Sequence, residues 1–291
     1  HSGSLFTDAN TKLHPTTDSM AEPESPSYAS RSATRQYRTT PLRGLWQHAP
    51  YFHDGSAKTL TEVVRKYDAK QQLGLTDQQV AAHPNAVVSA EFTELASGER
   101  IAKAAAALER NGIRSLLAAT GADARGLVRS LLVDGAEIYN NTSQTLEAIG
   151  VADDIERSGR YQPLRLRLYR MDREMQRHEM RTLAASPDYV VGSVHALTED
   201  GSLLIASASG SQLGPLVSGA GHVILVIGAQ KIVSDVTTGM RRIYEYCYPL
   251  EDARARRAYG VPSGVNNILI INKVITADRV TAIIVSERLG F

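Results

Sequence analysis

Short runs of almost wholly apolar residues recur through the chain after residue 112, and segments with helical periodicity separate them. Three of these runs, 189–194, 203–206 and 223–227, are apolar at successive positions and so on both faces of a strand. A strand needs apolar side chains on both faces when helices cover its sheet on both sides. The alternation therefore predicts an α/β fold in which a largely parallel sheet forms the centre of a layered sandwich.

The helical segments have recognisable starts and ends. Residues 97–111 form an Ala-rich helix, and Gly112 is expected to close it because glycine tolerates the left-handed backbone conformation. Ser143 can cap a further helix with its hydroxyl group. Other helices are expected over 122–132, 171–185, 239–248 and 251–259, and other strands over 113–118, 136–139, 267–271 and 280–286.

The composition changes near residue 80. Residues 1–37 are dense in Ser, Thr, Pro and Asp, which favour local hydrogen bonds over core packing and so predict loop. One helix is expected over 59–67, with Thr59 as its N-cap and Glu62 completing a capping box. We therefore expect an N-terminal segment over 1–80, a linker over 81–91, and a domain over 92–291.

Charge and hydropathy exclude several classes of function. The 32 basic and 31 acidic residues give a net charge of +1, so neither nucleic acid nor anionic lipid is expected as a partner. No run approaches the roughly 18–20 apolar residues of a membrane span, and no secretory apolar segment is present, which predicts a cytoplasmic protein. The single cysteine, Cys247, rules out an internal disulfide and is expected to be a buried small hydrophobe.

Two polar loops follow predicted strands, and ligands of open α/β sheets collect at the carboxyl ends of strands. The first loop can hydrogen-bond a carboxylate or phosphate beside the positive end of the next helix, although Ser143 could simply cap that helix. The second is rich in small residues, which let the backbone approach an anion, although a plain turn explains it too. The ligand-binding candidates are Asn140, Asn141, Thr142, Ser143 and Gln144 in the first loop, and Ser209, Gly210, Ser211 and Gln212 in the second.

A third candidate region runs from Gly192 and Ser193 to Glu199. His195 lies two residues after Ser193, so on a strand both would share one face, where the imidazole could act as acid or base. A hydrogen-bonded core histidine is the alternative. Glu199 is the carboxylate nearest to a strand end, but the sequence Glu-Asp-Gly from residue 199 is also typical of a hairpin turn.

Basic residues alternate at positions 165 and 167. On a strand, Arg165 and Arg167 would present two guanidinium groups on one face, suited to bidentate binding of a carboxylate. A solvated or ion-paired surface is the alternative. His178 and Glu179 lack the spacing of metal ligands, and no metal site is expected.

The C-terminal part resembles a known family along its whole length, residues 86–291. The resemblance is carried by FTELASGERIAKAAAALERNGI, NNTSQTLEAIG, MDREMQRHEMRTLAASPDYVVGSVHALTEDGSLLIASASGSQL, GAGHVILVIGAQKIV and RVTAIIVSERLGF. These segments are similar to the LUD (lactate utilisation) domain family. The resemblance implies a fold of the NagB/RpiA/CoA-transferase-like kind.

The LUD resemblance also implies a role in using lactate or related organic acids, with a small anionic metabolite as ligand. CoA transferases of the broader superfamily use a glutamate nucleophile, which adds weight to Glu199. Family members are linked to iron–sulfur proteins, so the alternative is a non-catalytic partner subunit of an iron–sulfur oxidoreductase. That alternative predicts an exposed apolar patch around Tyr244, Tyr246 and Tyr248. Whether the chain is an enzyme stays open.

The N-terminal segment resembles a different family. Residues 36–67, QYRTTPLRGLWQHAPYFHDGSAKTLTEVVRKY, are similar to the C-terminal part of the bacterial di-haem cytochrome c peroxidase family, which includes the MauG-like proteins. In that family haem is attached through CxxCH. The resemblance matches His1 to the haem-ligating His of that motif, His53 to the His of the PYFHDG motif, and Tyr67 to the distal ligand.

Covalent attachment of haem needs two thiol groups, and no cysteine lies near His1. We therefore expect a haemless remnant and no cofactor, with haem bound only if an intact CxxCH precedes His1. A natural fusion and a broken or misassembled gene are both compatible with the sequence.

Overall fold

The computed structural model describes residues 89–172 and 174–291, and of the preceding part only residues 13–15, 36–38, 58, 62, 63, 65, 66 and 69. The chain divides into two compact units, His1–Asn85 and Ala86–Phe291. The boundary between them falls inside the linker that the sequence predicts over 81–91.

In the N-terminal unit, strand β1 (Leu13–Pro15) pairs in antiparallel fashion with strand β2 (Gln36–Arg38). The expectation of loop over 1–37 is therefore wrong at β1, because three paired residues are too few to show a period in the sequence. Residues 62, 63, 65 and 66 are helical, in agreement with the helix expected over 59–67. The Glu62 carboxylate accepts a hydrogen bond from the backbone N–H of Lys58 at 2.5 Å.

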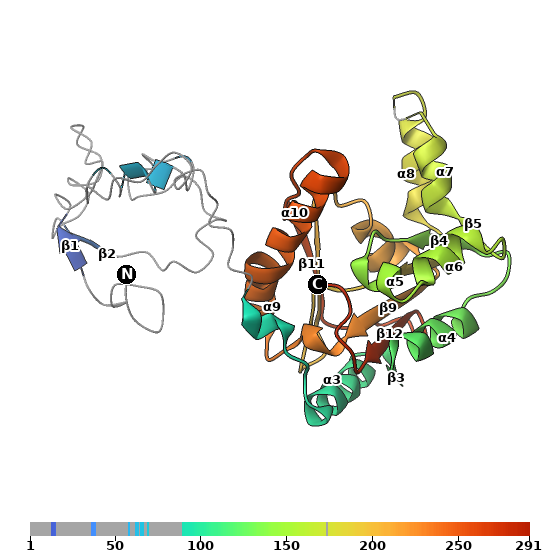
Figure 1. Ribbon diagram of the computed structural model, residues 1–291, viewed down its shortest axis with the longest axis horizontal. Coiled ribbons are helices and arrows are strands. Elements are labelled where there is room, and N and C mark those ends of the chain that lie inside the picture. Colours follow the sequence, from blue (N-terminus) through green and yellow to red (C-terminus); the bar gives the residue numbers. More distant parts are fainter. Residues whose placement is uncertain are drawn as a thin grey trace. The chain divides into compact units, whose positions relative to one another are not determined.

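The second unit is built on a six-stranded sheet in which every neighbouring pair is parallel (Figure 1). This arrangement confirms the predicted α/β fold with a largely parallel sheet. From edge to edge the strands are β3 (Arg114–Ala118), β12 (Val280–Val285), β9 (His222–Gly228), β6 (Tyr189–Gly192), β4 (Glu137–Asn140) and β5 (Gln162–Pro163).

A second, four-stranded sheet was not expected from the sequence. It contains β10 (Ile232–Val233), β7 (Ala196–Thr198), β8 (Leu203–Ser207) and β11 (Asn267–Ile271), in that order. Strands β7 and β8 form an antiparallel hairpin whose turn contains Gly201 at φ +87°. Short apolar strands have the same composition in either kind of sheet, so the sequence could not assign β8 to the second sheet.

The two faces of the parallel sheet are covered differently. On β9, Val223, Leu225 and Ile227 belong to a core cluster that includes Leu203 of the second sheet and Leu108 of helix α3. The residues between them, Ile224 and Val226, belong to a cluster with Val128, Leu146 and Ile155 of helices α4, α5 and α6. The apolar runs are thus buried on both faces as predicted, but one face packs on a second sheet as well as on a helix.

The helices agree in most places with the expected segments. They are α3 (Gly98–Arg110), α4 (Gly121–Leu131), α5 (Gln144–Ala148), α6 (Val151–Arg157), α7 (Leu164–Arg170), α8 (Arg177–Ala185), α9 (Val236–Arg242) and α10 (Tyr248–Tyr259), with short helical turns at η3 (Ala90–Thr93), η4 (Pro215–Gly219), η5 (Ala229–Lys231) and η6 (Ile243–Cys247). Ser97, Thr120, Ser143 and Asp235 cap helices with their side chains. No helix of the described residues is long and apolar enough to cross a membrane.

The prediction of an exposed apolar patch formed by tyrosines is wrong. Helix α9, turn η6 and helix α10 run on without a break, so residues 236–259 are helical throughout. Tyr246 is buried with Cys247 in a third core cluster, and Tyr244 packs against the same cluster. Tyr248 lines the cavity described below. The burial of Cys247 is confirmed.

Candidate functional site

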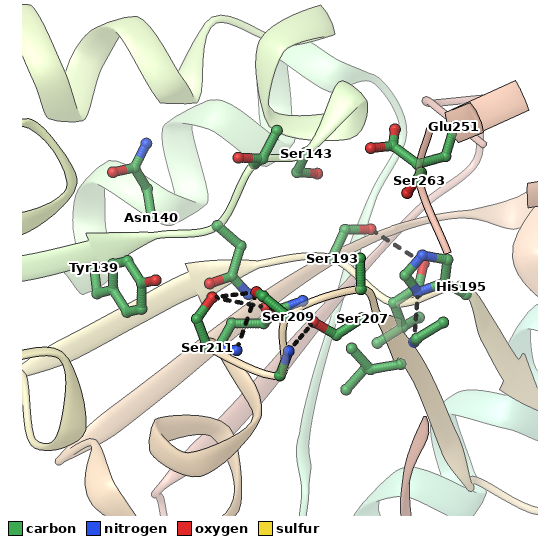
Figure 2. A pocket seen from close by; sticks show the side chains of 18 of the residues that line it. Tyr139, Asn140, Ser143, Ser193, His195, Ser207, Ser209, Ser211, Glu251 and Ser263 are labelled. Atoms are coloured by element: carbon green, nitrogen blue, oxygen red, sulfur yellow. Dashed lines mark hydrogen bonds between the residues drawn. The ribbon is translucent and has the colours of Figure 1, made fainter. Parts of the chain in front are cut away.

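A cavity of about 1010 Å³ lies at the carboxyl ends of β4, β6 and β8 (Figure 2). Its volume is at the upper end of the range of about 300–1,000 Å³ that small-molecule sites occupy. The chain leaves the parallel sheet after β6 and enters the second sheet at β7, so the ends of both sheets contribute to this cavity. The three polar regions singled out from the sequence meet here.

All residues of the first loop, 140–144, line the cavity. The Ser143 hydroxyl accepts a hydrogen bond from the Leu146 N–H at 3.4 Å, so this residue does cap helix α5. The Asn140 amide nitrogen donates to Glu156 at 2.8 Å. The buried Oδ1 atoms of Asn140 and Asn141 have no hydrogen-bond partner in the described part of the chain. Both oxygens are buried, so neither is exposed to the cavity.

The second loop contributes residues 207–212 to the same cavity. Its polar groups bond to one another: the Ser207 hydroxyl accepts from the Gly210 N–H at 2.9 Å and donates to Gln212 Oε1 at 3.0 Å. Ser209 donates to the Ser211 hydroxyl at 3.0 Å. Gly210 adopts a φ of +77°, which favours glycine at this position. The loop is a turn fixed by its own side chains that also forms a cavity wall.

Gly192 does not line the cavity, whereas Ser193 does. A Cβ atom on Gly192 would lie 2.7 Å from Nδ2 of Asn141, so the glycine makes room for that carboxamide. The Ser193 hydroxyl is half-buried and donates to the Val226 carbonyl at 2.7 Å. Gly192 therefore supports the site indirectly, and Ser193 is the residue of this pair that a ligand can reach.

His195 lines the cavity, but it lies in the bend between β6 and β7 and not on a strand. The expectation that alternation sets Ser193 and His195 on one strand face is therefore wrong. The imidazole Nδ1 accepts a hydrogen bond from the Ala206 N–H at 3.0 Å. Burial lowers the pKa of His195 to about 3, and the charges of Lys231 and Arg242 add to this effect. The ring is neutral at neutral pH, which favours the alternative of a hydrogen-bonded core histidine.

Glu199 lies outside the cavity wall. Its carboxylate accepts hydrogen bonds from Lys103 at 2.7 Å and from Arg100 at 2.6 Å, and these two bonds lower its pKa. It belongs to the turn of the β7–β8 hairpin, as the alternative interpretation predicted. The structure thus separates Glu199 from the loops proposed to bind the ligand.

Arg165 lines the cavity, but the predicted pair of guanidinium groups on one strand face is wrong. The sequence LRLRLYR alternates like a strand, yet it forms helix α7 directly after the two-residue strand β5. Arg165 pairs with Glu156 at 3.2 Å, whereas Arg167 pairs with Glu137 at 3.8 Å and does not line the cavity. Helical spacing therefore separates the two side chains.

Lys231 is the functional candidate that the sequence interpretation missed. It lines the cavity, yet its side chain is 2% exposed. The ammonium donates to Thr145 Oγ1 at 2.9 Å, Ser193 Oγ at 3.0 Å and the Val194 carbonyl at 3.1 Å. Burial lowers its pKa to about 7, and the positive charge of Arg242 contributes. A lone basic residue in the apolar run after β9 was the available signal.

Arg242 lies behind this wall of the cavity and is fully buried. Its Nη1 donates to the carbonyl of His195 and, at 2.9 Å, to the sulfur of Cys247. Its Nε and Nη2 atoms have no hydrogen-bond partner within the described residues. Neither Arg242 nor Lys231 forms an ion pair with a carboxylate in this part of the chain. Two buried basic side chains therefore lie near one wall of the cavity.

The charged residues of the cavity wall are mainly basic. Arg165, Arg181, Lys231 and Arg254 line it, against the single acidic residue Glu251, which pairs with Arg254 at 2.7 Å. Arg181 makes no ion pair with a described residue. Within the described ranges, no group of three or more His, Cys, Asp or Glu side chains could hold a metal ion. The arrangement suits a small anion.

The parallel sheet and the second sheet packed on it define an α/β domain with a basic cavity at the junction of its two sheets. Residues 101–285 match the model of the LUD domain, and the chain belongs to the LUD domain family. A solved structure of a DUF162 family protein from Deinococcus radiodurans is 13% identical, with 66% of this chain and 99% of that chain covered and a TM-score of 0.41. No curated protein matches the sequence.

Residues 36–72 match a second model, described as RoxA-like, cytochrome c-like, which confirms the predicted cytochrome-like segment. The 291 residues contain one cysteine, Cys247, which is buried in the other unit, so they cannot supply the two thioether bonds of a c-type haem. His1, His53 and Tyr67, the expected vestigial haem residues, lie outside the described residues. The residues present do not fit a covalently attached haem.

Proposed function

We propose that the LUD domain binds a small organic anion in this cavity, as part of the use of lactate or a related organic acid. The observation that carries the proposal is the buried ammonium of Lys231, which reaches the cavity wall without a carboxylate partner among the described residues. Buried charges in proteins are normally paired. An anionic ligand would supply the missing opposite charge.

The other polar groups favour a hydroxy acid over a simple inorganic anion. Arg181 lines the cavity and forms no ion pair with a described residue, so its guanidinium group is available to a carboxylate. Ser143, Ser193 and Ser211 line the same cavity, and a hydroxyl group can both donate and accept a hydrogen bond. A ligand with both a carboxylate and a hydroxyl group would pair with both kinds of protein group.

The test is a thermal-unfolding screen of the full chain with lactate, pyruvate, acyl-CoA and sugar phosphates. A ligand at a hundred times its Kd is expected to add roughly 2.7 kcal/mol of stability. Arg181→Met is expected to weaken binding about 10-fold, because it removes a charge-assisted hydrogen bond from the cavity wall. Lys103→Met is the control, because it removes a positive charge outside the cavity. Stabilisation by none of these anions would contradict the proposal.

A further inference from the structure

The geometry points to a serine–lysine catalytic dyad: we propose that Ser193 is the nucleophile and Lys231 its general base in hydrolysis of an ester or thioester of a small carboxylic acid. The two residues line the same cavity from different segments of the chain, and Figure 2 shows Ser193 in it. This inference rests on the proposed function, because the acyl group would occupy the cavity in which we place the organic anion.

The two groups lie within hydrogen-bond distance. Lys231 Nζ is 3.0 Å from Ser193 Oγ, inside the range of about 2.6–3.2 Å expected between a nucleophile and its base. Ser193 is half-buried and lines the cavity, whereas Lys231 is 2% exposed. Serine–lysine pairs are a known variant of the serine triad on unrelated folds.

A third group orients the base, as this kind of catalysis requires. Thr145 donates its hydroxyl hydrogen to the Leu289 carbonyl at 3.1 Å, so its lone pairs are left to accept from Lys231 Nζ at 2.9 Å. The Val194 carbonyl accepts a second hydrogen bond at 3.1 Å. Thr145 is therefore a positioning residue, and both acceptors would stabilise the ammonium that forms when the lysine takes the serine proton.

The protonation state of Lys231 also suits the role of general base. A lysine with a pKa of about 7 is neutral in about half of the molecules at pH 7, whereas an ordinary lysine is neutral in about one in three thousand. In the structure the Ser193 hydroxyl donates to the Val226 carbonyl at 2.7 Å. Rotation about its Cβ–Oγ bond would redirect the hydrogen to the lone pair of Lys231, with the oxygen unmoved.

The reaction balances without an oxidant or a reductant. Ser193 Oγ attacks the acyl carbon while its proton moves to Lys231 Nζ; the bond to the leaving alcohol or thiol then breaks, and the leaving group takes that proton. Water, deprotonated by Nζ, then attacks the acyl-serine. The bond between the acyl carbon and Ser193 Oγ breaks, Oγ takes the proton back from Nζ, and the carboxylic acid leaves. The Asn141 carboxamide packs beside Gly192, the residue before Ser193, and is a side-chain candidate to donate to the oxyanion.

A fluorophosphonate probe, which phosphonylates activated serines, tests the dyad on the full chain. Wild-type protein is expected to be labelled at Ser193, as read by intact mass and peptide mapping, at a rate that rises with pH through about 7. Ser193→Ala should abolish labelling, and Lys231→Met should slow it at least about 100-fold, as expected for loss of a general base. Ser130→Ala and Lys103→Met, both away from the cavity, are the matched controls.

Absence of labelling at Ser193 in folded wild-type protein would overturn the dyad, and so would an unchanged rate in folded Lys231→Met. If Lys231→Met does not fold, Lys231→Arg keeps the charge without a usable base and should show the same loss. Wild-type protein also separates the two proposals. Stabilisation by an organic anion without labelling would overturn the dyad alone, whereas labelling without stabilisation would overturn the anion site alone.

Discussion

At the scale of single residues, Lys231 and Arg242 dominate the electrostatics of the site. Both are among the largest fully buried side chains, and burying a charge costs free energy unless an opposite charge or good hydrogen bonds compensate. Lys231 has a full set of three acceptors, while Arg242 leaves two nitrogens without a partner among the described residues. The surrounding apolar core must offset this cost, and a bound anion would reduce it.

The titration of Lys231 gives a prediction for stability against pH. Its pKa is about 7 in the folded protein against a reference value of 10.5, so between these values the unfolded chain binds more protons. The free energy of unfolding therefore rises with pH across this window. The destabilisation that comes from burying the charged form of Lys231 is fully present below about pH 7. The free energy of unfolding of wild type minus that of Lys231→Met should increase by on the order of several kcal/mol from pH 7 to pH 10.

Urea denaturation of both proteins at several pH values measures this difference, and subtraction cancels the titration of groups that they share. Lys103→Met controls for the loss of a surface positive charge. If the difference between the two proteins stays constant over these pH values, Lys231 keeps an ordinary pKa. The proposal that Lys231 is half neutral at pH 7 and acts as a base would then be wrong.

Two loops of the cavity wall could be predicted from the sequence, whereas Lys231 could not. Polar loops after apolar strands could be predicted to converge, because the carboxyl ends of parallel strands meet at one edge of a sheet, and residues 140–144 and 209–212 do line one cavity. Lys231 could not be recognised in this way. Its partners Thr145 and Ser193 lie far away in sequence, and only the fold brings them to its ammonium.

At the scale of elements, the passage from β6 to β7 organises the site. Three residues, 193–195, carry the chain from the parallel sheet to the second sheet, which brings Ser193 and His195 to the junction of the two sheets. The sequence showed the apolar character of both strands but not the change of sheet, since alternation holds only along one continuous strand. The prediction of a strand at residues 165–167 was wrong for another reason. The residues of helix α7 alternate by chance between apolar and polar, as the residues of a strand do.

The hairpin between β7 and β8 packs closely on helix α3, which gives a prediction for Gly201. This residue has a φ of +87°, and a Cβ atom on it would lie 2.8 Å from the backbone carbon of Ala107. Gly201→Ala should therefore destabilise the fold by at least about 1–3 kcal/mol in urea denaturation, from strain in both the backbone and the packing.

Gly126 provides the matched control. It lies inside helix α4 with nothing within 4 Å of an added Cβ, so Gly126→Ala should stabilise the protein by up to about 1 kcal/mol through helix propensity. Equal effects of the two substitutions would contradict the close approach of the hairpin to α3.

At the scale of the whole molecule, the second unit contains its own hydrophobic core. The three hydrophobic clusters of the described residues are formed wholly by residues from Phe92 onward. All strands of the two large sheets also belong to this part of the chain. The LUD domain thus contains its own core, and residues 86–291 are the natural candidate for an independently folding unit.

This self-contained core predicts that residues 86–291, expressed alone, fold cooperatively and bind the same anion as the full chain. Their midpoint of thermal unfolding should lie within about 2 °C of the LUD transition of the full chain, a difference of less than about 1 kcal/mol for a domain of this size. Calorimetry of both proteins, with and without the anion, measures this difference between the two midpoints. A midpoint lower by about 5 °C or more would mean that the N-terminal unit stabilises the LUD domain, and the cytochrome-like segment would then have a structural role in this protein.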